Sequence, residues 1–159
     1  MKVITKLFLL CALTYAQSLL AQTEVADSYL DAYRGFDVKR MSEFYSEKAV
    51  FIDPTAEFWG GDGFHKVGKS EVVSSLNDFV AKFDDINLDF VVTHHYEAAG
   101  HNVYVGKAKL SLTKKGKLST SCGWLTTIIS VKDGKVTEHR DYFDYRGSKA
   151  TKKKADQDC

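Results

Sequence analysis

The first half of the chain carries its apolar residues at helical spacing. Residues 23–34 place Val25, Tyr29 and Tyr33 on one side, which is the three-to-four-residue period of an amphipathic helix. Gly35 ends this helix, and Asp37 is expected to cap a second, short helix. The inner face of that second helix is predicted to carry Met41, Phe44 and Tyr45. A third helix is predicted to begin at Ser70, with an apolar stripe between Val72 and Phe83.

From Ile86 onward the hydrophobic period changes from helical to two residues. Strands are predicted at 88–97, 103–113, 118–131 and 136–145, joined by short turns that contain glycine. An earlier strand is predicted at 49–53, and residues 55–67 are expected to form a loop. Helices followed by an antiparallel meander indicate an α+β fold, in which one curved sheet wraps around the helices.

The faces of two strands can be compared. In the strand 103–113, the inward set is predicted to be Tyr104, Gly106, Ala108, Leu110 and Leu112. The strand 118–131 is apolar on both sides, so the sequence leaves its inner face open.

The ends of the chain differ in composition from the centre. Lys2 and Lys6 precede a short apolar run and small residues, which is the layout of a secretory signal peptide. Cleavage is expected after Ala21, with Ala16 or Ser18 as alternatives. We therefore predict a leader at 1–21, one domain at 22–146, a basic flexible tail at 147–159, and a secreted or periplasmic mature protein without stable membrane insertion.

Charge and cysteine content narrow the possible partners. Loss of two leader lysines leaves 20 basic against 21 acidic residues, a net charge of −1, so no nucleic-acid partner is expected. Cys122 and Cys159 remain after processing. They could form a disulfide in an oxidising compartment, or Cys122 could be a small buried hydrophobic residue.

The last predicted strand carries the candidate chemistry. Alternation places His139, Asp141 and Phe143 on one face. A histidine and a carboxylate beside an aromatic ring are consistent with a reactive site or with a hydrogen-bonded core network. The sequence leaves both interpretations open.

Three short motifs in this order of elements resemble a known family: Tyr29-Leu-Asp-Ala, Phe44-Tyr-Ser-Glu-Lys-Ala-Val-Phe-Ile-Asp-Pro54 and Arg140-Asp-Tyr-Phe-Asp144. Over residues 24–146 the chain is similar to the SnoaL-like branch of the nuclear transport factor 2-like superfamily. The resemblance implies a cone-shaped α+β barrel with a pocket between sheet and helices, and a homodimer formed through the outer sheet face. It also implies a varied chemistry, because this fold hosts isomerases, cyclases, epoxide hydrolases and binding proteins.

Two branches of the superfamily suggest roles for residues. Tyr29 and Asp53 resemble the oxyanion-binding tyrosine and the general base of ketosteroid isomerases, whose third acid would fall near Thr127. Asp141 resembles an aspartate of limonene epoxide hydrolases, with His139 in place of a tryptophan. The arginine and aspartate of that second site fall on Gly106 and Ala108, or on Lys107 and Lys109 if the register is shifted by one residue. In either register its Asp-Arg-Asp arrangement is missing.

These comparisons lead to a set of candidates and two main hypotheses. The acid/base candidates are Asp141, His139, Asp53 and Tyr29. The predicted ligand-binding residues are Tyr33, Phe58, Trp59, Phe64, Leu110, Thr127 and Phe143. We expect no metal and no cofactor. One hypothesis is acid/base chemistry of the isomerase, cyclase or lyase type on a small hydrophobic carbonyl compound. The alternative is a protein that binds a small hydrophobic molecule without catalysis, or a dimeric interaction module with a vestigial pocket.

Overall fold

A computed structural model describes residues 21–59 and 63–145. The described chain begins with a helix over residues 21–34, called the N-terminal helix below, and continues into α2 (Val38–Phe44). The Asp37 side chain accepts a hydrogen bond from the Arg40 amide at 3.0 Å, so the predicted cap is confirmed. The third helix, α3 (Lys69–Val80), begins one residue before the predicted Ser70. No helix within the described residues is long and apolar enough to cross a membrane.

Six strands form one sheet in the order β2-β1-β6-β5-β4-β3. The bounds are β1 (Tyr45–Asp53), β2 (Phe64–Val67), β3 (Asp85–Ala98), β4 (His101–Lys114), β5 (Lys117–Lys132) and β6 (Lys135–Phe143). The predicted antiparallel meander is confirmed in β3 to β6. The sheet is mixed, however, because β1 runs parallel to β6.

Two local predictions were wrong. Tyr45 begins β1 with an extended backbone and does not lie on the face of α2. Residues 55–67 are not one loop: a 3-10 helix, η1 (Pro54–Trp59), is followed by β2, which pairs with β1. A four-residue strand is too short to give a clear period, so its hydrogen-bonding partner β1 determines its conformation.

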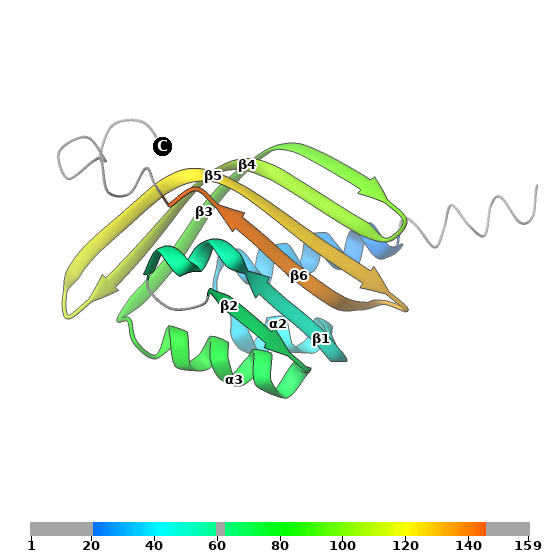
Figure 1. Cartoon of the computed structure of the whole chain (residues 1–159), viewed down its shortest axis with the longest axis horizontal. Coiled ribbons are helices and arrows are strands. Elements are labelled where there is room, and N and C mark those ends of the chain that lie inside the picture. The colour runs from blue at the N-terminus through cyan, green and yellow to red at the C-terminus, as the bar shows by residue number, and fades with distance from the viewer. Residues whose placement is uncertain (1–20, 60–62, 146–159) are drawn as a thin grey trace, which may run out of the picture.

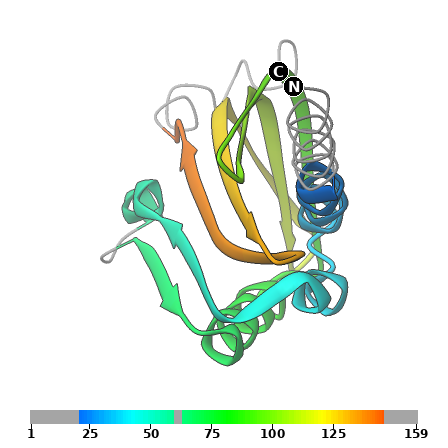
Figure 2. The ribbon, with the colours of Figure 1, turned by 90° about the vertical axis from the view of Figure 1, so that its right-hand side faces the viewer.

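The sheet is curved, and the helices lie on its concave side (Figure 1). A view from the side shows how β1 and β2 continue the sheet beyond β6, toward α3 (Figure 2). The fold class is therefore the predicted α+β architecture, with space for a pocket between the sheet and the helices.

The concave face carries the predicted inward residues of β4, and Tyr104 and Ala108 are buried there. The structure also resolves the ambiguity of β5, since Leu125, Thr127 and Ile129 are buried whereas Trp124 is half exposed. The β5–β6 turn has positive φ at both central residues, 52° at Asp133 and 70° at Gly134. This is the type I′ hairpin that an Asp-Gly pair favours.

Candidate functional site

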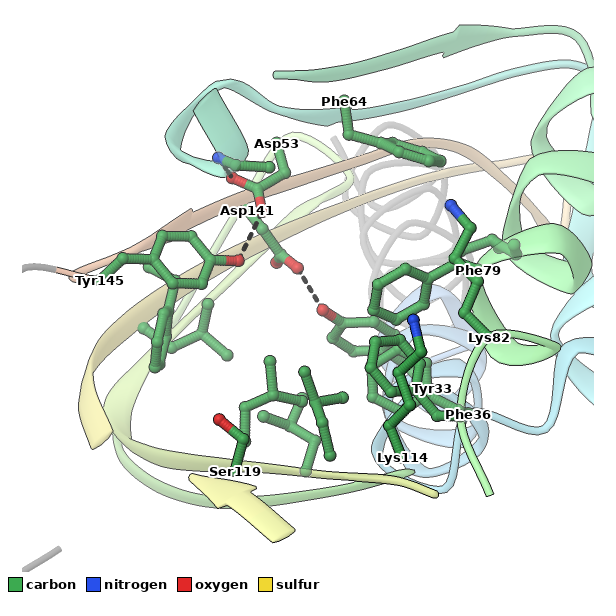
Figure 3. A pocket seen from close by; sticks show the side chains of 18 of the residues that line it. Tyr33, Phe36, Asp53, Phe64, Phe79, Lys82, Lys114, Ser119, Asp141 and Tyr145 are labelled. Atoms are coloured by element: carbon green, nitrogen blue, oxygen red, sulfur yellow. Dashed lines mark hydrogen bonds between the residues drawn. The ribbon is translucent and has the colours of Figure 1, made fainter. Parts of the chain in front are cut away.

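A cavity of about 840 Å³ lies between the concave sheet face and the helices. Its wall is mostly apolar, with aromatic rings from Phe36, Phe51, Phe79 and Phe83. Several residues that the sequence predicted for the site line it: Tyr33, Asp53, Phe64, Leu110, Asp141 and Phe143. Figure 3 shows Asp141 and Asp53 near each other on one side of this space.

Other predicted site residues lie behind the wall. Tyr29, Thr127 and His139 are fully buried and do not line the cavity. The rings of Tyr33 and Phe51 pack on the imidazole of His139, with centroids 4.5 and 4.1 Å away, and both of these rings face the cavity. The side chains of Phe58 and Trp59 lie outside the described residues, so their predicted roles stay predictions.

Asp141, on β6, accepts hydrogen bonds from three side chains. Its Oδ1 atom accepts from the Thr127 hydroxyl at 2.7 Å and is 2.9 Å from His139 Nε2. Its Oδ2 atom accepts from the Tyr33 hydroxyl. Both oxygens of Asp141 therefore act as hydrogen-bond acceptors within the protein.

A chain of buried hydrogen bonds continues from Asp141 away from the cavity. His139 Nδ1 is 2.7 Å from the Tyr29 hydroxyl, which is 2.6 Å from the Tyr45 hydroxyl. The neutral imidazole with its proton on Nε2 gives every donor in this chain an acceptor, from Tyr45 through Tyr29 and His139 to Asp141. We assign this tautomer because a protonated imidazole would leave the buried Tyr45 hydroxyl without an acceptor within the described residues.

Burial also keeps the tyrosines of this chain neutral. The pKa of Tyr29 is raised well above its usual value by desolvation and by the neighbouring Tyr45. Desolvation, followed by the charge of Asp141, raises the pKa of Tyr33 in the same direction. Both hydroxyls therefore stay protonated over the neutral pH range and act as hydrogen-bond donors.

Asp53, at the end of β1, has a different environment. Its Oδ1 atom caps η1 by accepting from the amides of Thr55 and Ala56 at 2.9 and 3.1 Å. Its Oδ2 atom accepts from the Tyr145 hydroxyl at 3.1 Å. Desolvation by burial raises the pKa of Asp53, the hydrogen bond from the Thr55 hydroxyl opposes the rise, and the charge of Asp141 adds to it.

The sequence analysis missed the tyrosine that donates to each of the two carboxyl groups. Tyr33 was predicted only as part of the pocket wall, and Tyr145 was not singled out. Spacing could have identified both: Tyr33 lies four residues after Tyr29 on one helical face, and Tyr145 lies two residues after Phe143.

The histidines on β3 and β4 do not converge on one point. His95 Nε2 is 3.2 Å from the Asn102 side chain, and His101 Nδ1 is 2.8 Å from the Ser130 hydroxyl. The described part of the chain contains no group of three or more His, Cys, Asp or Glu side chains placed to hold a metal ion. Cys122 is disulfide-bonded. Its partner lies outside the described residues, so a bond to Cys159 stays a prediction.

A profile of the SnoaL-like domain matches residues 26–139. The chain belongs to the SnoaL-like family. A comparison of the sequence with curated proteins finds no match.

Several solved structures share the fold of this SnoaL-like chain. A protein of Shewanella putrefaciens CN-32, provisionally named a SnoaL-like polyketide cyclase, is 24% identical with a TM-score of 0.66, over 79% of this chain and 81% of that one. A protein of Shewanella denitrificans OS-217 with the same provisional name is 21% identical with a TM-score of 0.65, over 79% and 92%. An epoxide hydrolase of Mycobacterium tuberculosis, named for its likeness to the limonene enzymes, is 14% identical with a TM-score of 0.63, over 82% and 84%. These likenesses show the shared fold.

The SnoaL-like site differs from both sites considered in the sequence analysis. Gly106 and Ala108 occupy the inward positions of β4, so the arginine and aspartate of the epoxide hydrolase arrangement have no counterparts there. Thr127, at the position of the third isomerase acid, donates its hydroxyl proton to Asp141. The Tyr29 hydroxyl contacts His139 and Tyr45. The carboxyl groups that reach the cavity among the described residues are thus Asp141, with Tyr33, and Asp53, with Tyr145.

Proposed function

We propose that this SnoaL-like protein transfers protons on a small, largely apolar carbonyl compound without a cofactor. The observation that carries the proposal is the presence of two carboxyl groups in one apolar cavity, with different environments. Asp141 accepts hydrogen bonds from three side chains, whereas Asp53 caps η1 and has a pKa that burial raises. Two carboxyl groups whose environments differ in this way are suited to act as base and acid.

Asp141 is the base in this scheme. Its Oδ2 atom takes a proton from the carbon next to the substrate carbonyl, and the electron pair of the broken C–H bond moves to the carbonyl oxygen. Once protonated, Asp141 holds the Tyr33 hydroxyl less strongly. That hydroxyl, or the acid form of Asp53, then donates to the developing oxyanion. Return of the proton from Asp141 to a different carbon of a conjugated enolate completes an isomerase step. In a cyclase step the enolate carbon instead attacks a second carbonyl carbon, whose oxygen takes the proton, and in a lyase step the bond to a leaving group breaks and that group takes the proton.

His139 and Tyr29 act as positioning residues, because neither lines the cavity. The bond from His139 to Oδ1 fixes the orientation of the Asp141 carboxyl group, and Tyr29 fixes the tautomer of His139.

Predicted export belongs to the same proposal. N-terminal sequencing of the protein secreted by its own host should find Gln22 as the first residue, and an intact Met1 would contradict export with cleavage.

The test is proton exchange at carbon. We would incubate the protein in D₂O with a panel of small cyclic and aryl ketones and follow loss of the α-proton signal by NMR. Asp141→Asn keeps the size of the side chain and should slow exchange about 10²-fold or more. Asp133→Asn, in the exposed β5–β6 turn, is the matched control and should exchange at the wild-type rate. Equal rates in a folded Asp141→Asn variant would refute the proposed role of Asp141.

One observation favours a second function, the binding of a small hydrophobic molecule without catalysis. Both oxygens of Asp141 already accept hydrogen bonds from the protein, as a structural carboxylate would. Native mass spectrometry of the protein purified from its own host distinguishes the two. A bound molecule that remains chemically unchanged after prolonged incubation supports binding alone, and a bound molecule that exchanges or is converted supports the enzyme.

The size of the cavity does not favour the third hypothesis, a vestigial pocket, because it lies within the range of about 300–1,000 Å³ seen for ligand sites. The convex face of the sheet does expose large side chains, among them Val91, Tyr96, Trp124 and Tyr142. A homodimer through this face remains part of the proposal, and sedimentation analysis of the purified protein would test it.

A further inference from the structure

Four lysines line the opening of the cavity, whereas its interior is apolar and carries the two aspartates. We call them the lysine rim: Lys82, Lys114, Lys115 and Lys117. Lys82 follows α3, and the other three lie at the end of β4 and the start of β5. All four are exposed. Among the described residues no other charged side chain lines the cavity, so within this part of the chain the opening is positive and the acidic groups lie deeper inside.

Contacts between backbone segments bring the two parts of the lysine rim together. The Asp84 amide donates to the Thr113 carbonyl at 2.7 Å, which joins the segment after α3 to the end of β4. The ammonium group of Lys114 lies 5.9 Å from the centre of the Phe83 ring, next in sequence to Lys82. Figure 3 shows Lys82 and Lys114 on the same side of the cavity, beside Phe79 and Phe36.

The lysine rim has no anionic partner within the described residues. None of its lysines forms an ion pair with a carboxylate there. The nearest acidic side chain on the joined segments, Asp84, accepts from the Gly116 amide at 2.9 Å and does not line the cavity. Lysines on a hairpin are often simply solvated. Here, however, lysines from two separate elements surround one opening. Their combined positive potential attracts an anion, and a bound anion relieves their mutual repulsion.

Resting on the proposed function of the cavity, we propose that its ligand is an amphipathic aromatic anion. Its anionic group, such as a carboxylate, binds at the lysine rim. Its aromatic body packs on the rings of Phe36, Phe79 and Phe83, and its uncharged carbonyl end faces Asp141. The separation of charges orients the molecule, because an anionic end at the floor of the cavity would meet the Asp141 carboxylate.

Matched ligands test this inference. We would measure the binding of phenylalkanoates of three chain lengths and of their primary amides by calorimetry, using the full mature chain. Each amide has nearly the shape of its acid but no charge. The best acid should bind about tenfold more tightly than its amide at low ionic strength, since each exposed charge pair contributes up to about fivefold. That preference should fall as salt is added, because the Debye length shortens.

Two double variants locate the effect. Lys82→Gln with Lys114→Gln should remove most of the preference for the acid while leaving amide binding unchanged. Lys48→Gln with Lys132→Gln changes the net charge equally at exposed positions away from the cavity and should retain the preference. Circular dichroism of each variant confirms that it is folded.

The inference and the proposed function fail in different ways. Equal affinity for acid and amide, no binding of any acid, or an equal loss in both double variants would overturn the anionic ligand, even if ketone exchange is observed. Binding of wild-type protein to vesicles with 30% anionic lipid, without preference for any acid, would assign the lysine rim to a membrane surface and also overturn it. Preferential acid binding without proton exchange on any carbonyl compound would support the ligand class and refute catalysis.

Discussion

The buried hydrogen-bond chain gives a prediction about stability in which one hydroxyl matters more than its neighbour. Tyr29→Phe removes the hydroxyl at the centre of the chain and keeps the ring, whose edge contacts with Phe44, Tyr45 and His139 remain. Two buried groups then lose their partner: His139 Nδ1 has no donor, and the Tyr45 hydroxyl has no acceptor. His139 cannot compensate by moving its proton to Nδ1, because Nε2 must donate to Asp141.

The magnitude follows from the number of unpaired groups. An unsatisfied buried polar group costs about 1–3 kcal/mol, so the two groups unpaired by Tyr29→Phe should lower the free energy of unfolding by about 2–6 kcal/mol. Tyr45→Phe removes only the end of the chain, because Tyr29 still donates to His139. It should cost about 1 kcal/mol. In the Tyr29→Phe background the same Tyr45→Phe change removes an unpaired hydroxyl, so it should stabilise the protein.

The assay is urea unfolding of the four proteins of this double-mutant cycle, under non-reducing conditions. Free energies of unfolding are compared only between proteins whose unfolding free energy falls with urea concentration at the same slope. A variant with a different slope has also changed the compactness of its unfolded or folded state. A Tyr45→Phe change of equal cost in both backgrounds would mean that the two hydroxyls act independently, and the proposed chain would be refuted. So would a Tyr29→Phe variant within about 0.5 kcal/mol of the wild type.

Two further predictions concern Asp53 and β4. Because burial raises the pKa of Asp53 above 3.8, the stabilising contribution of Asp53 is full below that pH and is lost as the pH rises through the raised pKa. Asp53→Asn can keep the cap on η1, so this variant should gain stability relative to the wild type as the pH rises from 4 to 7. A stability difference that urea unfolding finds unchanged over this range would contradict the raised pKa. Gly106→Ala places a Cβ atom 2.0 Å from a backbone oxygen of β3 and should destabilise the protein by about 3 kcal/mol or prevent folding. The control Gly116→Ala has open space around its Cβ atom but a φ of +70°, and it should cost about 1 kcal/mol. Equal thermal stability of the two variants would contradict the close approach of β3 to Gly106.

Local periodicity was enough to predict most of the fold. The N-terminal helix, α3 and the meander follow from the spacing of apolar residues, because each of these elements is long and buries one face. The parallel pairing of β1 with β6 was not predicted. It joins segments some ninety residues apart, Val50 with Glu138 for example, and no local pattern records which distant strand supplies the hydrogen bonds.

The same limit explains what the sequence predicted of the site. Alternation correctly placed His139 and Asp141 on one inner face, but it could not say which tyrosine each would contact. The spacing of the two tyrosines on the helix matches the spacing of His139 and Asp141 on the strand. Four residues of helix rise about 6 Å, and two residues of strand rise about 6.6 Å. Tyr29 and Tyr33 on the N-terminal helix can therefore contact His139 and Asp141 one to one, as they do. Only the packing of the N-terminal helix across β6 fixes this register.

The roles of the two cavity carboxyl groups follow from how their hydrogen bonds are distributed. Asp141 receives donors from a strand neighbour, a helix and its own strand, so removing its charge would leave several buried donors facing a weaker acceptor. Asp53 uses Oδ1 to cap η1, and its Oδ2 contacts the Tyr145 hydroxyl. The negative charge of Asp141 further disfavours ionisation of Asp53. Under the proposed function, these two carboxyl groups are the two partners of a proton transfer within one cavity that is open at the lysine rim.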